Sequence, residues 1–367
     1  MKKTIFHDLH VELGARMAEF GGFMMPIQYQ GIIAEHMACR NGATLFDTCH
    51  MGEFKLAGDG VVADLERLVS CDVASMKYGQ CRYGLLCNEK GGVIDDLLVY
   101  RFADKDFMLV VNAGTQDNDF AWVEAHLSAG TRAENVSDQT AKIDLQGPAT
   151  PKIMQKLMAE TVADLKFYHF MKNKYRGAEV IVSRTGYTGE MGFEIYGDAA
   201  TATAFWKECM ELGAVPAGLG ARDTLRLEVG MPLYGHELSE ERNAAESGFS
   251  RSISDSKTFI GCESLRNAAN VKSALVGIEL EGRRAARNGD GLADAGGRPV
   301  GIVTSGSFAP SLEKAIALGY VEKKSAAPGT VIAVKTARSD IPGRVVELPF
   351  YKGGSARRPV AEFLGTV

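Results

Sequence analysis

The stretch Gly91–Tyr100, GGVIDDLLVY, places two adjacent carboxylates, Asp95 and Asp96, inside an otherwise apolar run. A turn signal, Asn88-Glu-Lys-Gly-Gly92, precedes the run, whose residues are mostly β-branched or aliphatic, so it predicts a strand that leaves a hairpin. Successive side chains of a strand face opposite ways, so the two carboxylates lie on opposite faces. Neither face is polar, and the alternation does not say which carboxylate is buried.

A carboxylate buried in this strand has to be hydrogen-bonded, paired or protonated, because an isolated charge in apolar surroundings is very costly. A carboxyl group held in that way is a candidate general acid or base. A structural role, as an edge residue with a turn or cap partner, also explains the pair, and the spacing taken alone favours it.

Length and composition set the class of protein. A chain of 367 residues predicts two or three domains. The net charge of -5 gives no reason to expect a nucleic-acid partner, which usually requires a basic stripe. The 7 cysteines are scattered without a C-x-x-C pair, which argues against a disulfide scaffold or a metal site and suits a reducing compartment. Because no run approaches the roughly 18 apolar residues of a membrane span, we expect a cytoplasmic protein without a membrane partner.

Strand and helix periods alternate along the first two thirds of the chain. Two rounds of this rhythm predict α+β units of the ferredoxin-like or split βαβ kind. The predicted strands are 44–56 (carrying Cys49-His50-Met51-Gly52), 82–86, 93–101, 107–112, 142–145, 179–184 and 192–196. The predicted helices are a short one near Phe6–Leu13, then 31–41, 59–70, 116–128, one starting at Pro148–Pro151, 199–212, and one after Gly218.

The texture changes after residue 270 to short strands punctuated by Gly, Pro and Asp. This pattern predicts a small antiparallel β-barrel or jelly roll, with strands at 275–280, 300–304, 314–320, 331–336 and 345–348. The shift in composition between residues 245 and 270 marks the expected domain boundary.

Two further segments carry groups suited to ligand binding. Thr185–Glu194, TGYTGEMGFE, is a Gly-rich loop that lets backbone approach a flat ligand, with Tyr187 as a stacking face and Glu194 as an acceptor for an amino-heterocycle. Gly218–Glu228 begins with glycines and continues as a helix that carries Arg222 and Arg226 on one face, where they can bind an anion or fix a buried carboxylate. A solvated hairpin and surface arginines explain the two segments about as well.

The chain offers no recognisable protein nucleophile. It has no Gly-x-Ser-x-Gly elbow and no His and carboxylate cluster with metal-ligand spacing. The groups available are carboxylates, arginines and tyrosines. This inventory favours a reaction in which a bound cofactor does the chemistry while the protein positions and polarises it.

Taken in order, these segments resemble the aminomethyltransferase (T-protein) family of the glycine cleavage system. The resemblance covers essentially the whole chain and rests on an ordered set of motifs, each weak alone. They are Gly22-Phe-Met-Met-Pro26, Phe46-Asp-Thr-Cys-His-Met-Gly52, GGVIDDLLVY, Val111-Asn112, Gln146-Gly-Pro148, Ser183–Glu190, Gly218–Glu228, Thr304–Ser311 and the closing basic tail.

The resemblance implies a fold of three domains around folate: two α+β domains and a C-terminal antiparallel β-barrel. The first domain is expected to be discontinuous, at 1–51 and 138–250, with the second at 52–137 and the barrel at 251–367. The implied activity takes the aminomethyl group from the lipoyl arm of the H-protein, transfers its methylene to tetrahydrofolate and releases ammonia. The implied partners are the lipoylated H-protein and tetrahydrofolate, with no metal.

The resemblance also assigns roles to individual residues. Asp96 matches the catalytic aspartate, which orients the folate and assists proton movements. The other matching positions fall into four groups: the pterin end (Glu194, Arg226), the pocket lining (Met51, Tyr83, Tyr100, Tyr187), a matching strand (Val111, Asn112), and the folate tail and lipoyl entrance (Arg287, Arg358).

The chain departs from the family pattern at three places. Phe23 stands where Trp is usual, and Cys49 stands where Ser is frequent. Between Arg242 and Ile253, the family commonly carries a Pro-x-Glu-x-Gly run followed by a Trp near the folate, and here Arg251 falls at the Trp position.

Two alternative functions remain at this point. A tetrahydrofolate-dependent demethylase could use the same fold, although the related sulfonium demethylases lack the Asp-Asp pair. A non-catalytic folate-binding iron–sulfur assembly factor would carry a Lys-Gly-Cys-x-x-Gly-Gln-Glu stretch, and Lys257–Glu263, KTFIGCE, lacks that arrangement.

Overall fold

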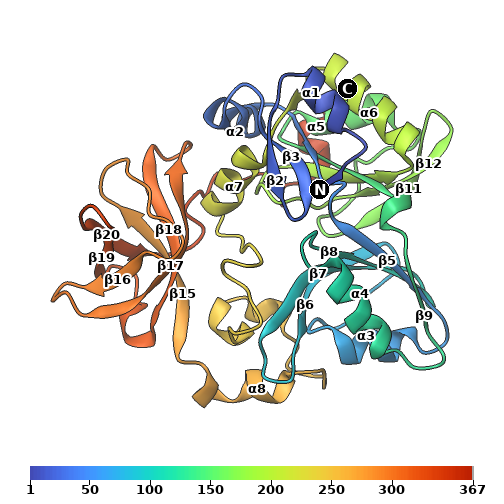
Figure 1. Ribbon diagram of the computed structural model, residues 1–367. Coiled ribbons are helices and arrows are strands. Elements are labelled where there is room, and N and C mark those ends of the chain that lie inside the picture. The colour runs from blue at the N-terminus through green and yellow to red at the C-terminus, as the bar shows by residue number, and fades with distance from the viewer. Residues whose placement is uncertain (366–367) are drawn as a thin grey trace.

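Strands form four separate assemblies in residues 1–365, which the computed structural model describes (Figure 1). The strands of the α+β part are β1 (Lys2–Lys3), β2 (Arg16–Phe20), β3 (Phe23–Gln28), β4 (Thr44–Asp47), β5 (Gly52–Ala57), β6 (Gln80–Cys87), β7 (Val93–Ala103), β8 (Asp106–Val111), β9 (Arg132–Asn135), β10 (Ala141–Gln146), β11 (Phe170–Tyr175), β12 (Ala178–Ser183), β13 (Gly192–Gly197) and β14 (Val215–Pro216). The helices are α1 (His7–Glu12), α2 (Ile32–Asn41), α3 (Val61–Leu68), α4 (Gln116–Ala125), α5 (Thr150–Leu157), α6 (Ala199–Glu211), α7 (Leu219–Glu228) and α8 (Cys262–Arg266).

The first large sheet has six strands in the order β11-β12-β13-β10-β4-β14. Helix α6 packs on it because Ala202, Phe205, Trp206 and Cys209 repeat at helical spacing and are all buried. Asp198 caps this helix, its side chain accepting a hydrogen bond from the Thr201 N–H. The sheet draws one strand from before residue 52 and the others from after residue 140.

The second sheet has five strands in the order β6-β7-β8-β5-β9, and α3 and α4 lie against it (Figure 1). The predicted hairpin is confirmed, because β6 and β7 pair antiparallel with Leu85 opposite Asp96 and Leu86 opposite Asp95. On its other side β7 pairs with β8, so the two aspartates lie in an inner strand of the sheet.

One predicted strand, residues 44–56, was wrong as a single element. The chain forms β4, leaves the six-stranded sheet and enters β5 of the five-stranded sheet. The turn between them is closed by local bonds: the Asp47 carboxylate accepts from the Cys49 N–H at 2.9 Å, and the Met51 N–H donates to the Thr48 carbonyl at 3.1 Å. The break therefore places Met51 where the two large sheets meet.

The Gly-punctuated segment Phe20–Pro26 forms a hairpin, with β2 and β3 on either side of the turn. Gly21 and Gly22 adopt φ of 56° and 85°, the left-handed region that favours glycine. The hairpin belongs to a three-stranded sheet of order β1-β3-β2.

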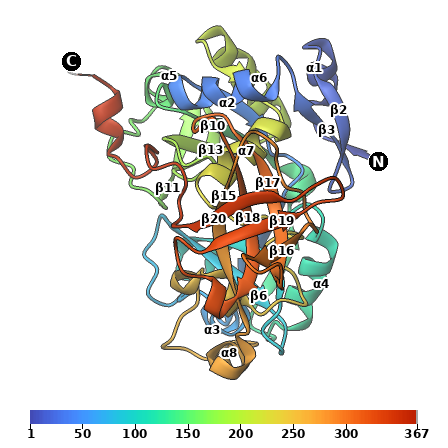
Figure 2. The ribbon, with the colours of Figure 1, turned by 90° about the vertical axis from the view of Figure 1, so that its left-hand side faces the viewer.

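The strands that follow residue 270 form a closed barrel of order β15-β18-β17-β16-β19-β20, which faces the viewer in Figure 2. Its strands are β15 (Ser273–Leu280), β16 (Gly291–Asp294), β17 (Pro299–Ala309), β18 (Lys314–Glu322), β19 (Val331–Lys335) and β20 (Ile341–Val346). The predicted fold class is thus confirmed, while the domain limits stay a prediction. Within residues 1–365, no helix combines the length and the hydropathy that a membrane crossing requires.

Candidate active site

Strand β7 sends its two carboxylates in opposite directions. Asp95 is fully buried on the face that α4 covers. Asp96 is partly buried on the face of Leu98 and Tyr100, which packs against Phe170 of the six-stranded sheet. The structure therefore answers the question that alternation left open: Asp96 faces the junction of the two sheets.

The Asp96 carboxyl group is held by neutral donors. The Tyr83 hydroxyl donates to Oδ2 at 3.0 Å, and the Asn112 side-chain amide donates to Oδ1 at 2.9 Å. Burial and the neighbouring Asp95 raise the pKa of Asp96 to about 7. The two donors, Tyr83 and Asn112, carry no positive charge that would offset this rise. A carboxyl with this pKa is populated in both protonation states at neutral pH, as general acid–base work requires.

A second polar group lies on the central strand β10. Lys142, Asp144 and Gln146 alternate along one face of a strand in which every residue is buried. Lys142 Nζ lies 2.8 Å from Glu194 Oε1, and Arg222 Nη1 lies 2.5 Å from Asp144 Oδ2. Strand β10 thus carries buried ion pairs where an ordinary core strand would be apolar.

Glu194 is an ionised, hydrogen-bonded acceptor. In addition to Lys142, the Thr185 hydroxyl donates to its Oε2 at 2.7 Å and the Tyr196 hydroxyl at 3.1 Å. Burial alone would raise the pKa of Glu194, but Lys142 and the hydroxyl donors outweigh it and lower the pKa to about 2. A permanent buried anion of this kind suits a ligand that presents N–H donors.

Four other predicted residues lie around these two carboxylates. The Tyr100 hydroxyl donates to Ser183 Oγ at 3.0 Å and approaches Glu194 at 3.4 Å. Met51 Sδ lies 3.6 Å from Lys142 Nζ. The Arg222 guanidinium lies over the Tyr187 ring, 4.9 Å from the ring centroid. Val111 is buried in β8 and precedes Asn112, whose N–H and side-chain amide both bind Asp95.

Arg226 is buried and bound to protein groups. Its guanidinium reaches Asp223 at 2.8 Å, Glu237 at 3.0 Å and Ser305 Oγ at 2.8 Å, so it joins α7 to barrel strand β17. The positive charge of Arg226 also acts on Tyr187, which connects it to the site.

Arg287 and Arg358 lie apart from the residues described above. Both are exposed: Arg287 follows β15 on the barrel, and Arg358 pairs with Glu362 at 2.8 Å near the C-terminus. Arg287 lines a surface pocket of about 600 Å³ together with Arg284 and Arg338. Within the described residues, neither arginine has a hydrogen bond or ion pair to any other predicted site residue.

Sequence reasoning missed several residues of the site. Lys142 and Asp119 were not singled out, although polar residues alternating within strand 142–146 were a usable signal. Tyr168 was also missed; it adopts φ of 59°, unusual for a tyrosine, and burial together with nearby Glu194 and Asp96 raises its pKa. No local pattern marks such a residue.

The region that lacks the family's Trp supplies an aromatic from a neighbouring position. Arg251 is exposed, but the Phe249 ring lies 6.4 Å from the Tyr83 ring, centroid to centroid. Tyr83 is the donor to Asp96, so Phe249 supports the site from the segment in which the motif departs.

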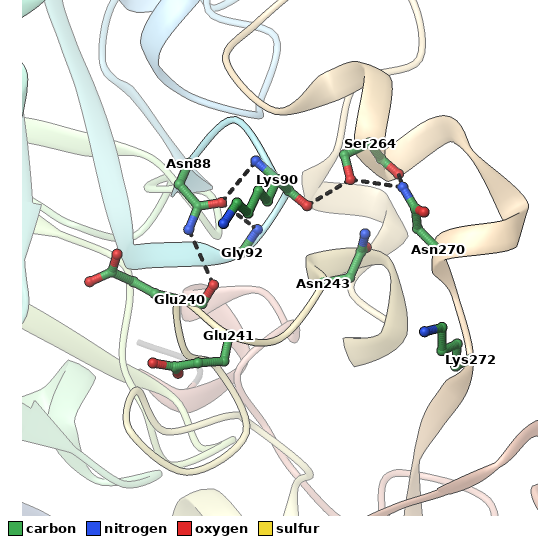
Figure 3. Close-up of a pocket in the computed structure, with 9 residues that line it drawn as sticks. All are labelled: Asn88, Lys90, Gly92, Glu240, Glu241, Asn243, Ser264, Asn270 and Lys272. Atoms are coloured by element: carbon green, nitrogen blue, oxygen red, sulfur yellow. Dashed lines mark hydrogen bonds between the residues drawn. The ribbon is translucent and has the colours of Figure 1, made fainter.

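A separate surface pocket of about 600 Å³ opens at the turn of the β6–β7 hairpin (Figure 3). Asn88 donates to the Glu240 carbonyl at 3.1 Å across it, and Lys90 and Lys272 lie on its walls. None of the predicted site residues lines this pocket. Across residues 1–365, no group of three His, Cys, Asp or Glu side chains is arranged to hold a metal ion.

Comparison with known proteins places the whole chain in one family. The GCVT N-terminal domain family matches residues 6–257, and the glycine cleavage T-protein C-terminal barrel domain matches residues 274–352. An aminomethyltransferase of Halothermothrix orenii is 43% identical over 357 residues, covering 95% of this chain and 100% of the relative. One of Moorella thermoacetica is 42% identical over 361 residues, covering 96% and 98%.

A solved structure agrees with these relatives. The glycine cleavage system aminomethyltransferase T from Bartonella henselae superposes with a TM-score of 0.91 at 30% identity, covering 96% of this chain and 99% of that chain. The chain therefore belongs to the aminomethyltransferase (T-protein) family of the glycine cleavage system.

Proposed function

We propose that this aminomethyltransferase takes the aminomethyl group from the dihydrolipoyl arm of the H-protein, passes its methylene to tetrahydrofolate and releases ammonia, with Asp96 as the catalytic residue. The observation that carries the proposal is the Asp96 carboxyl, held by Tyr83 and Asn112, with a pKa raised to about 7. It combines the geometry and the ionisation that proton transfer at neutral pH requires.

The donor and acceptor groups fit a folate. A pterin presents an amino group and ring N–H donors, which match the ionised Glu194 carboxylate. The rings of Tyr187 and Tyr83 offer faces for its flat ring system, and Asp96 offers an acceptor for the nitrogen that bridges to the benzoyl group. When bound, tetrahydrofolate supplies two nucleophilic nitrogens for the methylene, and their protons leave with the sulfur and the ammonia.

The residues of the chain then have separate tasks. Asp96 accepts a proton at its carboxylate and returns one to the departing group, because both of its forms are populated at neutral pH. Asn112 and Tyr83 fix the orientation of Asp96 through one hydrogen bond to each oxygen. Lys142 keeps Glu194 ionised, so that Glu194 remains an acceptor.

The two exposed arginines are proposed to lie near the folate tail and the entrance for the lipoyl arm. Arg287, beside Arg284 and Arg338, forms a basic surface pocket that suits the glutamate tail of folate. Arg358 lies in the C-terminal segment, whose backbone is tied down by Arg184 through the Ala356 carbonyl at 2.9 Å. We assign Arg358 to the entrance for the lipoyl arm.

The test is ammonia release from H-protein whose lipoyl arm carries the aminomethyl group. We expect release that requires both tetrahydrofolate and the loaded H-protein, and none when either is left out. Folate binding without ammonia release, under conditions in which another T-protein turns over, would contradict the proposal.

A further inference from the structure

Three carboxyl groups form a row that runs from the active site into the protein. Asp96 faces the sheet junction, Asp95 follows on the opposite face of β7, and Asp119 lies behind Asp95 in the first turn of α4. The side-chain amide of Asn112 donates to Asp96 Oδ1 at 2.9 Å and to Asp95 Oδ1 at 2.8 Å. One amide group thus links the first two carboxyls directly.

The inner two carboxyls are buried together. Asp95 and Asp119 are both 0% exposed, and their side chains lie close enough for each to shift the pKa of the other. Both oxygens of Asp95 accept from Asn112, the N–H at 2.9 Å and the amide at 2.8 Å. Both oxygens of Asp119 are buried and have no hydrogen-bond partner among residues 1–365; the groups that face them are the Thr115 hydroxyl and the Asp95 carboxyl.

The charged groups around this row are themselves acidic. Burial raises the pKa of both Asp119 and Asp95; Asp96 and Glu240 raise that of Asp119 further, and Asp119 raises that of Asp95 further. Two tyrosines also face the row, Tyr234 and Tyr83, and both keep their protons because burial and the nearby carboxylates raise their pKa values. Two ionised carboxylates in contact away from water repel strongly, so such a pair retains a proton.

We propose that Asp95 and Asp119 share one proton at neutral pH, and that this proton controls whether Asp96 is ionised. The shared proton keeps the charge of the pair at -1, divided between Asp119 and Asp95, and the part on Asp95 raises the pKa of Asp96. Asp95 and Asp119 are therefore positioning residues, since they act through Asp96. The inference rests on the proposed role of Asp96 for its functional meaning, but the shared proton itself can be measured without turnover.

Asparagine at each position tests the arrangement in a different way. In Asp119→Asn the new amide donates to Asp95, which becomes the ionised group next to Asp96. The pKa of Asp96 then rises, by on the order of 1 pH unit for one adjacent charge. In Asp95→Asn the side chain next to Asp96 carries no charge, so the pKa of Asp96 stays or falls.

The experiment is a ¹³C NMR titration of the unliganded full-length chain with ¹³C-labelled aspartate carboxyls. A matched control is Asp64→Asn, because Asp64 is a buried carboxylate of the same sheet-and-helix unit that is bound by Ser128 and Thr131 and not by the row. We expect the Asp96 midpoint to rise in Asp119→Asn, to stay or fall in Asp95→Asn, and to be unchanged in the control.

An unchanged Asp96 midpoint in both row variants would overturn the proposal. Wild-type spectra decide the question if a variant does not fold: we expect one carboxyl of the Asp95 and Asp119 pair to stay protonated at pH 7, and ionisation of both below pH 6 would overturn it. Since no substrate is present, a failure here is distinguishable from a failure of the aminomethyltransferase assay.

Discussion

The raised pKa of Asp96 has a cost in stability that can be measured. The pKa rises from the ordinary 3.8 to about 7 in the folded chain, so between these values the folded state holds a proton that the unfolded state has lost. The free energy of unfolding therefore falls as pH rises through this window, and below about pH 4 the group contributes nothing.

Asp96→Asn removes this dependence. We expect the variant to gain stability relative to wild type as pH rises from 5 to 8, by on the order of 3 kcal/mol, because a tenfold change in an acid dissociation constant corresponds to about 1.4 kcal/mol. Urea unfolding at fixed ionic strength measures the difference. A difference that stays the same across this pH range would show that Asp96 is not a carboxyl with a raised pKa.

The buried Lys142–Glu194 pair supplies a second prediction. In Lys142→Met a buried anion loses its partner, which typically costs about 3–5 kcal/mol, whereas adding Glu194→Gln removes the anion and recovers most of the loss. The exposed pair Lys314–Glu279, 3.0 Å apart, is the control, and Lys314→Met is expected to cost less than about 1 kcal/mol. Equal losses in the two Lys→Met variants, measured by urea unfolding, would contradict the assigned burial.

The sequence predicted the placement of single residues only where the local backbone geometry fixes which way a side chain points. Alternation placed the two aspartates on opposite faces, but only packing against α4 showed that Asp95 is the inner one. Lys142 escaped notice because its partner Glu194 is on a strand that joins β10 only in the folded sheet. The same holds for Arg226, whose partner Ser305 belongs to the barrel.

At the scale of elements, the hairpin that carries the aspartates was predictable because turn and strands are encoded in one continuous segment. The strand predicted at 44–56 failed because β4 and β5 both consist of strand-forming residues, and the turn between them is set by two local hydrogen bonds, one to Asp47 and one to Thr48. Hairpin strand β3 was hidden by Pro26 within it and by Gly21 and Gly22 just before it, since these residues predict turns.

The β6–β7 hairpin depends on a close backbone contact at Gly92. A Cβ at this position would lie 1.8 Å from the Glu240 carbonyl oxygen, so Gly92→Ala has to displace backbone on one side. We expect a loss of at least about 1–3 kcal/mol and faster amide exchange in β7, measured by urea unfolding and hydrogen exchange.

Gly291→Ala serves as the control for this change, because a Cβ there makes only an ordinary 3.7 Å contact with Lys335. Near-equal effects of the two substitutions would mean that the hairpin does not rest on the Glu240 segment.

Across the whole molecule, the barrel and the α+β part are joined by buried charges. Glu237 accepts from Arg226 at 3.0 Å, from the Leu233 N–H at 2.9 Å and from the Thr304 hydroxyl at 2.5 Å, so one carboxylate contacts α7, its following loop and β17. Long-range ties of this kind cannot be found from sequence periodicity, although each of the joined units was recognisable by itself.

Glu237→Gln tests this junction. An amide replaces one acceptor oxygen and leaves Arg226 without its buried counter-charge, so we expect a loss of about 3–5 kcal/mol. Earlier proteolysis between α8 and β15 than in wild type is the expected readout of a loosened barrel. The exposed Glu322→Gln, which removes a partner of Arg298, is the matched control and is expected to leave the pattern unchanged.

The central claim is that Asp96 moves protons during aminomethyl transfer. The direct measurement compares wild type and Asp96→Asn for ammonia release from loaded H-protein, with folate affinity determined separately for both. We predict that kcat falls at least about 100-fold in the variant, the scale of general acid–base assistance, while folate still binds. Turnover within a few-fold of wild type in Asp96→Asn would contradict the account.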